Sequence, residues 1–279
     1  ARIRVLTPEK ICEKLDDRFR LLTGGKRTAL PRQQTLKALI DWSYDLLNEN
    51  EKILFQRLSV FSGGWTLEAA EEICSDENFD SYETMDTHSH LLDKSLINKT
   101  ETSGSIRFYF LESIRQYANE ILDPDDKVHN AHFNYFMKIS DQSLMLSDSM
   151  DQKQWAKLID TETGNLRSAI NRALDSDPEN ACIIVNNMIN YWDIKAYFLE
   201  GLLTCKKVYN LNLENVSEIN KAKINYSLGL MYNNVGNIPD AEKFIKDALI
   251  IFRKIDDKLG ISECLNSLGV IISISPSRM

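Results

Sequence analysis

The sequence lacks the features of disulfide-rich proteins, of membrane-spanning proteins, and of proteins whose whole surface binds nucleic acid. Its five cysteines are scattered and form no Cys-x-x-Cys pair, which argues against a disulfide framework or a zinc site. No apolar run approaches the roughly 18 residues of a membrane span, and the first residues contain no signal-peptide core. Lys and Arg number 33 against 41 Asp and Glu, and the net charge of −8 disfavours nucleic-acid binding over the whole surface. We therefore expect a cytoplasmic protein.

The residues that are present suit an ordinary globular fold. Hydrophobic residues make up 43% and charged residues 27% of a 279-residue chain, which is long enough for about two domains. The chain begins at Ala1 and enters a helical pattern at once, with Thr7-Pro8-Glu9 as a helix start. We interpret the sequence as a piece of a longer protein.

The stretch Thr23–Gly64 predicts a hinge followed by two helices. Thr23-Gly24-Gly25 can end a helix, and Asn48 can cap the second helix because Glu51 stands three residues later. Apolar and small residues recur at helical spacing on both sides of Asn48. These residues are Leu36, Leu39, Ile40, Ser43 and Leu47 before the second helix, and Leu54, Leu58 and Phe61 within and after it.

Two short patterns suggest ligand sites and fail on spacing. A phosphate loop needs G-x-x-x-x-G-K-[ST], but Arg20 replaces the first glycine and Arg27 follows Lys26. We expect a hinge with solvated charges there. Asp86, His88 and His90 are too few and too loosely arranged for a metal site, so we expect the two histidines to lie at the surface.

The next segment predicts helices followed by one hairpin. Thr66 can cap a helix over residues 67–74, and a helix through residues 85–97 would turn Leu91, Leu92, Ser95 and Leu96 inward. Two β-prone runs within residues 97–110 flank a Thr-Ser-Gly turn, and a helix from Leu111 stops before Pro124. Helices with one hairpin indicate a winged helix.

From Val128 onward the pattern is almost entirely helical and ends in a repeat. Leu228-Gly229, Tyr232, Gly236, Ala241 and Ala248 have the order and spacing of a tetratricopeptide repeat, in which small residues let paired helices approach closely. Leu268-Gly269 recurs 40 residues after Leu228-Gly229. We expect two helices whose buried faces consist of Phe133, Phe136, Met137 and Leu144 in the first, and of Trp155, Leu158, Leu166, Ile170 and Leu174 in the second. Pro178 can start a further helix.

Three segments together resemble one family. RFRLLTGGKRTALPRQQTLKALIDWSYDLL, LFQRLSVFSGGWTLEAAEEIC and RFYFLESIRQYANEIL are similar to the winged-helix region of STAND proteins, the signal-transduction ATPases with numerous domains. Within that group they resemble bacterial transcriptional regulators and adenylyl cyclase fusions that end in tetratricopeptide repeats. The resemblance runs more weakly into the C-terminal repeats and so covers most of the chain.

The resemblance implies a mainly α fold with four regions. Residues 1–32 would be the tail of an ATPase helical lid and a hinge, 33–123 the winged-helix domain, 124–212 a helical-repeat-like linker region, and 213–279 truncated tetratricopeptide repeats. It also implies that the parent protein binds ATP or ADP with Mg²⁺, in some members beside a cyclase, while this segment holds no cofactor. Lys26, Arg27 and Arg32 are the candidates for contact with the ATPase core or a phosphate.

The family's nucleotide-sensing triplet departs from its usual form here. Many relatives open the helix after the wing with a Met-His-Asp-like triplet whose histidine contacts a nucleotide phosphate, and the matching positions are Phe110, Leu111 and Glu112. Leucine cannot donate that hydrogen bond. Direct nucleotide sensing at Leu111 is therefore not expected.

Three functions remain open, and none is catalytic. Adjacent acidic pairs such as Asp16-Asp17 point apart on a helix, and no nucleophile motif is present, so we expect no enzyme activity in this segment. The first hypothesis is a regulatory segment in which the winged helix controls its own ATPase core and the repeats sense an inducer or protein partner. A DNA-binding winged helix is the second, weakened because the helices LEAAEEIC and YETMDTHSHLLDK are acidic or mixed. A plain repeat scaffold is the third.

Overall fold

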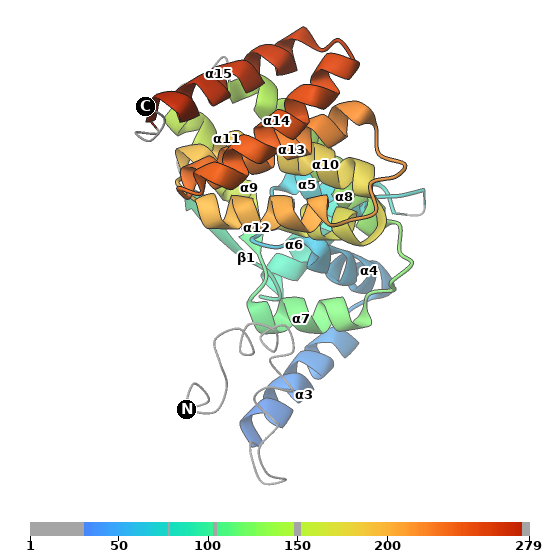
Figure 1. Ribbon diagram of the computed structural model, residues 1–279. Helices are drawn as coiled ribbons and strands as arrows, with labels where there is room; N and C mark the ends of the chain where they lie inside the picture. Colours follow the sequence, from blue (N-terminus) through green and yellow to red (C-terminus); the bar gives the residue numbers. More distant parts are fainter. Residues whose placement is uncertain (1–30, 78, 103–104, 148–151, 275–279) are drawn as a thin grey trace. The chain divides into compact units, whose positions relative to one another are not determined.

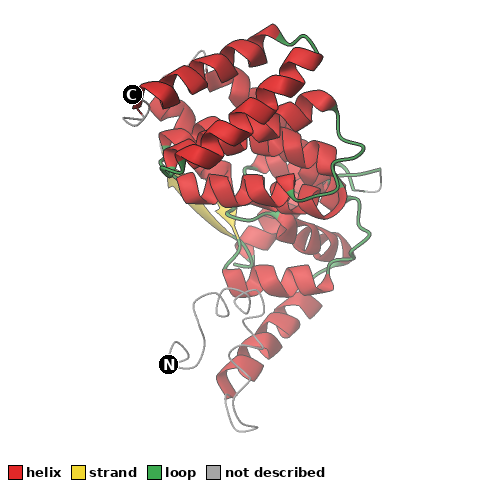
Figure 2. Cartoon of the chain, in the orientation of Figure 1, coloured by secondary structure: helices red, strands yellow, loops and turns green. Residues whose placement is uncertain are grey.

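The computed structural model describes residues 31–77, 79–102, 105–147 and 152–274, which form two compact units. Unit 1 ends at Tyr135 and unit 2 begins at Phe136, within one helix. Helices dominate both units, and one hairpin supplies the named strands (Figures 1 and 2). The helix expected after Thr7 and the hinge at Thr23–Gly25 lie outside the described residues.

Unit 1 contains short helices around one hairpin. Its elements are α3 (Pro31–Asp45), α4 (Glu49–Arg57), the 3₁₀ turn η2 (Leu58–Val60), α5 (Leu67–Cys74), α6 (Ser81–Asp93), β1 (Asn98–Thr102), β2 (Ser105–Tyr109), α7 (Glu112–Ile121) and the start of α8 (Val128–Ser147).

Side-chain caps start α4, α5 and α6. Asn48 and Glu51 form the expected capping box at α4, and Thr66 Oγ1 accepts a hydrogen bond from the Ala69 amide at α5. Asp80 and Glu83 form a second capping box at α6, which the sequence analysis overlooked. Each cap satisfies amides that a helix leaves unpaired, so the chain's local chemistry sets these helix starts.

The prediction of a helix through residues 85–97 is wrong at both ends. α6 begins at Ser81 because Asp80 caps it, and it ends at Asp93 because Ser95 adopts a left-handed φ of 58°. The Leu96 amide then donates to the Leu91 carbonyl, which closes the helix. Ser95 is consequently exposed outside the helix instead of facing inward, whereas Leu91 and Leu96 are buried.

The hairpin is confirmed, and a short bridge extends it. β1 and β2 pair antiparallel with Asn98 opposite Tyr109. Trp65 pairs with Phe108 through two backbone hydrogen bonds of 2.9 and 2.8 Å. Gly64 permits this approach, because its φ is 94° and a Cβ there would lie 2.5 Å from the Phe108 carbonyl oxygen. The hairpin thus joins the start of the α5 segment.

Aromatic rings fill the core between these elements. Phe55 lies between Tyr44 and Phe110, with ring centroids 5.6 and 5.3 Å away, and Trp65 packs on both Phe61 and Phe110. Ile40 and Leu47 are buried as expected, but Leu39 is exposed, so only part of the predicted face of α3 is buried in this chain.

Unit 2 is a stack of helices. The helices are the rest of α8, then α9 (Gln152–Ser176), α10 (Pro178–Asn187), α11 (Ile189–Ile194), α12 (Phe198–Tyr209), α13 (Glu218–Asn234), α14 (Ile238–Lys254) and α15 (Lys258–Ile274). Figure 1 shows α13, α14 and α15 following one another as neighbouring helices. Trp155, Leu166 and Ile170 are buried as expected, whereas Leu158 is exposed, and Pro178 does start a helix.

From α10 onward, and apart from the short helix α11, the helix starts of unit 2 are 20 residues apart. Helices begin at residues 178, 198, 218, 238 and 258, so one pair of helices takes 40 residues. Three junctions close in the same way: Ala196, Gly236 and Asp256 have left-handed φ angles of 55°, 81° and 55°. The residue after each donates its amide to a carbonyl five positions earlier, at 2.8 to 3.0 Å. The predicted fold class, a mainly α chain with a winged helix, one hairpin and helix pairs, is confirmed.

Candidate functional site

Helix α6 occupies the recognition position of the winged helix, because it is the second helix of the α5–α6 pair and precedes the hairpin. Thr84, Thr87, His88 and Leu91 are buried on its inner side. Its exposed side carries three carboxylates, Glu83, Asp86 and Asp93, and the helix contains no Lys or Arg. Such a surface repels DNA phosphates and offers few donors to base edges.

The nearest lysine after α6 is bound to a buried carboxylate. Lys94 Nζ lies 2.7 and 2.6 Å from the two carboxylate oxygens of Glu51, whose side chain is almost fully buried. Burial alone would raise the pKa of Glu51, but the hydrogen bonds from Lys94 and the Asn48 amide outweigh burial and lower that pKa. Lys94 therefore ties α6 to α4, and its positive charge is balanced by the Glu51 carboxylate.

The hairpin contributes little free positive charge. Arg107 Nη2 donates to the Gly64 carbonyl at 3.1 Å and so helps hold the Trp65–Phe108 bridge. Lys99 is exposed on β1, with the carboxylate of Glu101 two residues further along the same strand. The described hairpin residues thus form no basic stripe along the backbone path of a duplex.

The expectation of two surface histidines is half wrong. His90 is exposed, but His88 is buried and its Nε2 accepts a hydrogen bond from Trp65 Nε1 at 3.1 Å. The Phe108 ring packs on the imidazole at 4.2 Å. Burial lowers the pKa of His88 from 6.5 to about 4, so the ring is neutral at pH 7. The available signal was the spacing of three and four residues from His88 to Leu91 and Leu92, which the sequence analysis expected to face inward.

Arg57 forms a polar centre that sequence analysis missed. Its guanidinium donates to Asp76 at 2.5 Å, to the Cys74 carbonyl at 2.7 Å and to Asp126 at 3.3 Å. Its side chain is 12% exposed. Burial lowers its pKa less than the two aspartates raise it, so the charge is retained. One residue therefore ties α4 to the α5–α6 and α7–α8 connections.

The three residues that stand at the positions of the family's nucleotide-sensing triplet lie in the core and at the start of α7. Phe110 is buried against Phe55 and Trp65. Leu111 stands at the N-cap of α7 and is 55% exposed, and Glu112 pairs with Arg115 within the same helix. Leu111 is therefore on the surface of unit 1, where its side chain offers an apolar contact and no hydrogen bond.

The proposed phosphate contacts lie at the edge of the described chain. Lys26 and Arg27 fall outside the described residues. Arg32 belongs to the first turn of α3, and its side chain is also outside the description. Within the part of the chain that the structure describes, no group of His, Cys, Asp and Glu could hold a metal ion. The same residues include no helix long and apolar enough to cross a membrane.

The repeat-motif residues lie at the helix contacts of unit 2. Leu228, Ala241 and Ala248 are fully buried, Tyr232 stacks on Phe244 at 5.4 Å, and Gly236 forms the left-handed junction. A Cβ on Gly229 would overlap Ile245 Cγ1. Leu268 packs against the same core, whereas a Cβ on Gly269 would meet nothing within 4 Å. The two Leu-Gly pairs thus have different surroundings.

Residues 47–123 match the model of the winged helix-turn-helix domain family. The match contains α4, α5, α6 and the hairpin, so this part of the chain is a winged helix-turn-helix domain. The order of its elements gives the same class independently.

Curated relatives come from mycobacteria. "Putative HTH-type transcriptional regulator Rv0890c" of Mycobacterium tuberculosis is 37% identical over 205 residues, covering 72% of this chain and 23% of its own length. "Uncharacterized protein Rv0894" of the same organism is 39% identical over 123 residues, covering 44% of this chain and 31% of its own length. The chain thus spans about a quarter to a third of these relatives.

One solved structure is similar across 96% of this chain and 42% of its own. It is a STAND protein with a tetratricopeptide repeat sensor, PH0952 from Pyrococcus horikoshii, at 17% identity and a TM-score of 0.40.

Proposed function

We propose that this chain is the regulatory and protein-interaction segment of a STAND-type, ATP-dependent signalling switch. In this proposal unit 1 contacts the ATPase core of the parent protein, and the helical repeats of unit 2 respond to an inducer or a protein partner. The segment itself is not an enzyme and holds no cofactor. The winged helix-turn-helix match and the relative named as a transcriptional regulator support a regulatory role.

The acidic surface of α6 is the observation that carries the proposal. A winged helix that reads DNA needs donors and positive charge on this helix, and here Glu83, Asp86 and Asp93 are the charged residues. A domain that has the winged-helix fold but lacks positive charge on α6 is better suited to bind protein than DNA.

An exposed apolar stripe on α3 and the turn that follows it supports the same conclusion. Leu39, Trp42 and Leu46 are 55%, 63% and 61% exposed and recur at spacings of three and four residues. Contiguous exposed apolar residues of this size mark surfaces that bind protein. Since α3 is the first described helix and the sequence predicts a hinge before it, we assign this stripe to the ATPase core.

Binding assays on the chain test the proposal. The 279-residue chain should bind the separately produced ATPase core of its parent, and Trp42→Ala should weaken that binding while leaving the melting temperature unchanged. The chain alone should neither bind nor hydrolyse ATP. Nucleotide binding by the chain alone would contradict the assignment of the ATPase to another segment.

DNA binding is the second candidate, and the winged helix-turn-helix match favours it. A duplex titration at low and moderate salt separates the two functions, since affinity for DNA falls steeply as salt increases. We expect no complex at low salt. A salt-sensitive complex that Lys99→Glu weakens would favour the DNA-binding function.

A further inference from the structure

The exposed face of α6 combines two large apolar side chains with two carboxylates. Tyr82 and Met85 are 77% and 39% exposed, and Asp86 and Asp93 follow on the same side of the helix. The carboxylates of Asp86 and Asp93 make no ion pair among the described residues. We call these four residues the acidic face. Aromatic residues and methionine are enriched where proteins bind one another, so this face suits a protein partner that carries positive charge.

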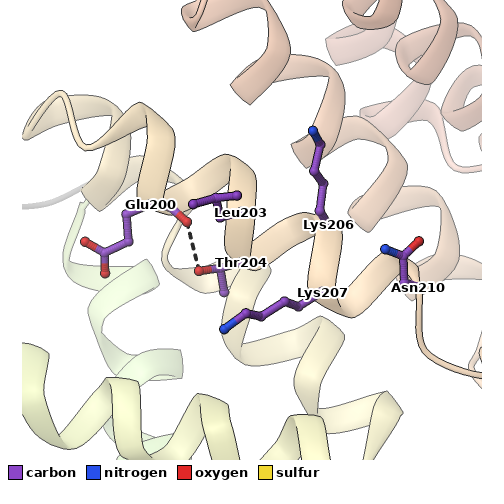
Figure 3. A pocket seen from close by; sticks show the side chains of 6 residues that line it. All are labelled: Glu200, Leu203, Thr204, Lys206, Lys207 and Asn210. Atoms are coloured by element: carbon purple, nitrogen blue, oxygen red, sulfur yellow. Dashed lines mark hydrogen bonds between the residues drawn. The ribbon is translucent and has the colours of Figure 1, made fainter. Parts of the chain in front are cut away.

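The exposed face of α12 has the opposite charge. Leu199 and Leu203 are 68% and 60% exposed, and Lys206 and Lys207 follow one turn later. We call these four residues the basic face. Figure 3 shows both lysines extending away from α12, beside a hollow of about 620 Å³ that Leu203 also lines. Lys207 and Asn171 of α9 line a smaller hollow of about 160 Å³.

The two lysines of the basic face are not neutralised within the part of the chain that the structure describes. The nearby Glu200 carboxylate binds Arg167 through two hydrogen bonds of 2.7 Å, and neither Lys206 nor Lys207 forms an ion pair there. Lys206 Nζ lies 4.9 Å from the centroid of the Tyr232 ring, which orders the side chain without cancelling its charge. The basic face therefore offers two unpaired cations in a chain of net charge −8.

The acidic face and the basic face match in order as well as in charge. On each helix two exposed apolar residues come first, and two residues of one charge follow toward the C-terminus. If the two helices lie side by side in the same direction, the apolar parts meet and the carboxylates meet the lysines. Opposite charges in such a contact increase the rate of association and fix the register of the two surfaces.

We propose that the acidic face of one copy of this chain binds the basic face of a second copy. The apolar side chains of the two faces pack together, and the carboxylates accept charge-assisted hydrogen bonds from the lysines. Because the two faces differ, each bound copy keeps one free face, and association can continue into rings or open chains. The inference rests on the proposed function only in that α6 binds protein.

Sedimentation of the 279-residue chain over a range of concentrations tests the contact. An interface of two helix faces is small, so the association should be weak and reversible. It should weaken further as salt is added, because the charges lie at the surface. A chain that remains a monomer at low salt up to about 1 mM overturns the proposal.

Charge-reversal variants test which faces take part. Asp86→Lys on α6 and Lys207→Glu on α12 each bring like charges together, and each should weaken self-association by about 10-fold or more. Glu101→Lys on β1 and Lys157→Glu on α9 make the same changes of charge at exposed positions outside both faces, and should leave self-association unchanged. Equal losses in the variants and their controls would assign the effect to net charge and overturn the proposal.

Mixing the two variants tests whether the contact joins two copies. The intact acidic face of the Lys207→Glu chain can bind the intact basic face of the Asp86→Lys chain, so the mixture should associate although each variant alone does not. A chain with both substitutions should also self-associate, because the charges are exchanged. A mixture that remains monomeric overturns the proposal, provided that both variants keep the melting temperature of the unaltered chain.

Trp42→Ala separates this inference from the proposed function. It should weaken binding of the ATPase core and leave self-association unchanged. A chain that binds the core but never self-associates keeps the proposed function and refutes this inference. A chain that self-associates through the two faces but does not bind the core refutes only the assignment of the core to α3. Loss of self-association in Trp42→Ala would place the contact on α3 and overturn the proposal.

Discussion

The long-range contacts inside unit 1 differ in arrangement from those inside unit 2. In unit 1, single contacts join residues far apart in sequence, such as Arg57 with Asp126 at a separation of 69 residues. In unit 2, contacts with a separation of 41 residues recur: Asn186 with Ser227, Asp193 with Asn234, and Tyr226 with Ser267. The first and the last of these occupy equivalent positions, 40 residues apart. Unit 1 has one copy of each contact, and unit 2 has several.

This difference predicts different responses to substitution. A compact domain with one buried polar centre should lose stability as a whole when that centre is removed. A stack of helices interacts mainly between neighbours, so its stability is close to a sum of local terms. Equivalent positions of unit 2 can also serve as controls for one another within the same molecule.

The largest effect is expected at Arg57. Arg57→Met removes the cation that the partly buried carboxylates of Asp76 and Asp126 share, and should destabilise unit 1 by about 3 to 5 kcal/mol. Lys37→Met removes an exposed pair with Glu120 and should cost less than about 1 kcal/mol. Urea unfolding followed by tryptophan fluorescence measures both. Equal losses would show that Arg57 is no more central than a surface lysine.

The next effect is a pH dependence confined to unit 1. Because burial holds the pKa of His88 near 4 while the unfolded chain has the ordinary value of 6.5, the unfolded state binds a proton first as pH falls. Stability should therefore be full above pH 6.5 and decrease between pH 6.5 and 4, by about 3 kcal/mol at about 1.36 kcal/mol per pKa unit.

His88→Gln should remove this pH-dependent loss, because glutamine does not titrate. His90→Gln, at an exposed position of the same helix, should keep it. Urea midpoints measured from pH 7 to pH 4 provide the comparison. A similar slope in all three proteins would assign the acid sensitivity to other groups.

The paired glycines of unit 2 should respond in opposite directions. Gly229→Ala forces a methyl group against Ile245 and the Ala241 carbonyl, and should cost about 1 to 3 kcal/mol. Gly269→Ala meets nothing within 4 Å and should stabilise α15 by up to about 1 kcal/mol through helix propensity. Amide hydrogen exchange of α13 and α15 measures the two effects separately. A loss at Gly269 equal to that at Gly229 would contradict the difference in packing.

The smallest effect concerns the junctions. Gly236→Ala encounters no steric contact, so only its left-handed φ of 81° opposes alanine, and we expect a loss of about 1 kcal/mol. Ala196→Gly at the equivalent junction should change stability by less than about 1 kcal/mol, since relief of its φ is offset by a more flexible unfolded chain. Thermal unfolding measures both. A larger loss at Ala196 would show that its methyl group contributes packing.

Local chemistry was predictable from the sequence, and long-range contacts were not. The capping box of α4, the hairpin and the helix at Pro178 depend on residues within a few positions, so their patterns are visible in the sequence. The end of α6 was missed because a serine in a left-handed conformation has no sequence signature comparable to glycine.

The candidate sites show the same limit. The burial of His88 depends on Trp65 and Phe108, which lie 23 positions before and 20 positions after it, and the three meet only when the hairpin bridge forms. Asn171 of α9 and Lys207 of α12 line the same hollow only because their helices pack together. The 20-residue spacing of helix starts was the available signal, but the repeat became visible in sequence only near Leu228, where Gly and Ala mark the close contacts.

The uniform junctions of unit 2 have a consequence for how such a chain can change length. Because α12, α13 and α14 each occupy 20 residues with their connections and three junctions share the same closing hydrogen bond, residues 198–237 begin and end in equivalent positions. A tandem duplication of that segment would present matching surfaces to both neighbours. The array can therefore gain or lose whole helix pairs without redesign of the remaining interfaces, which makes it a modular spacer as well as a binding surface.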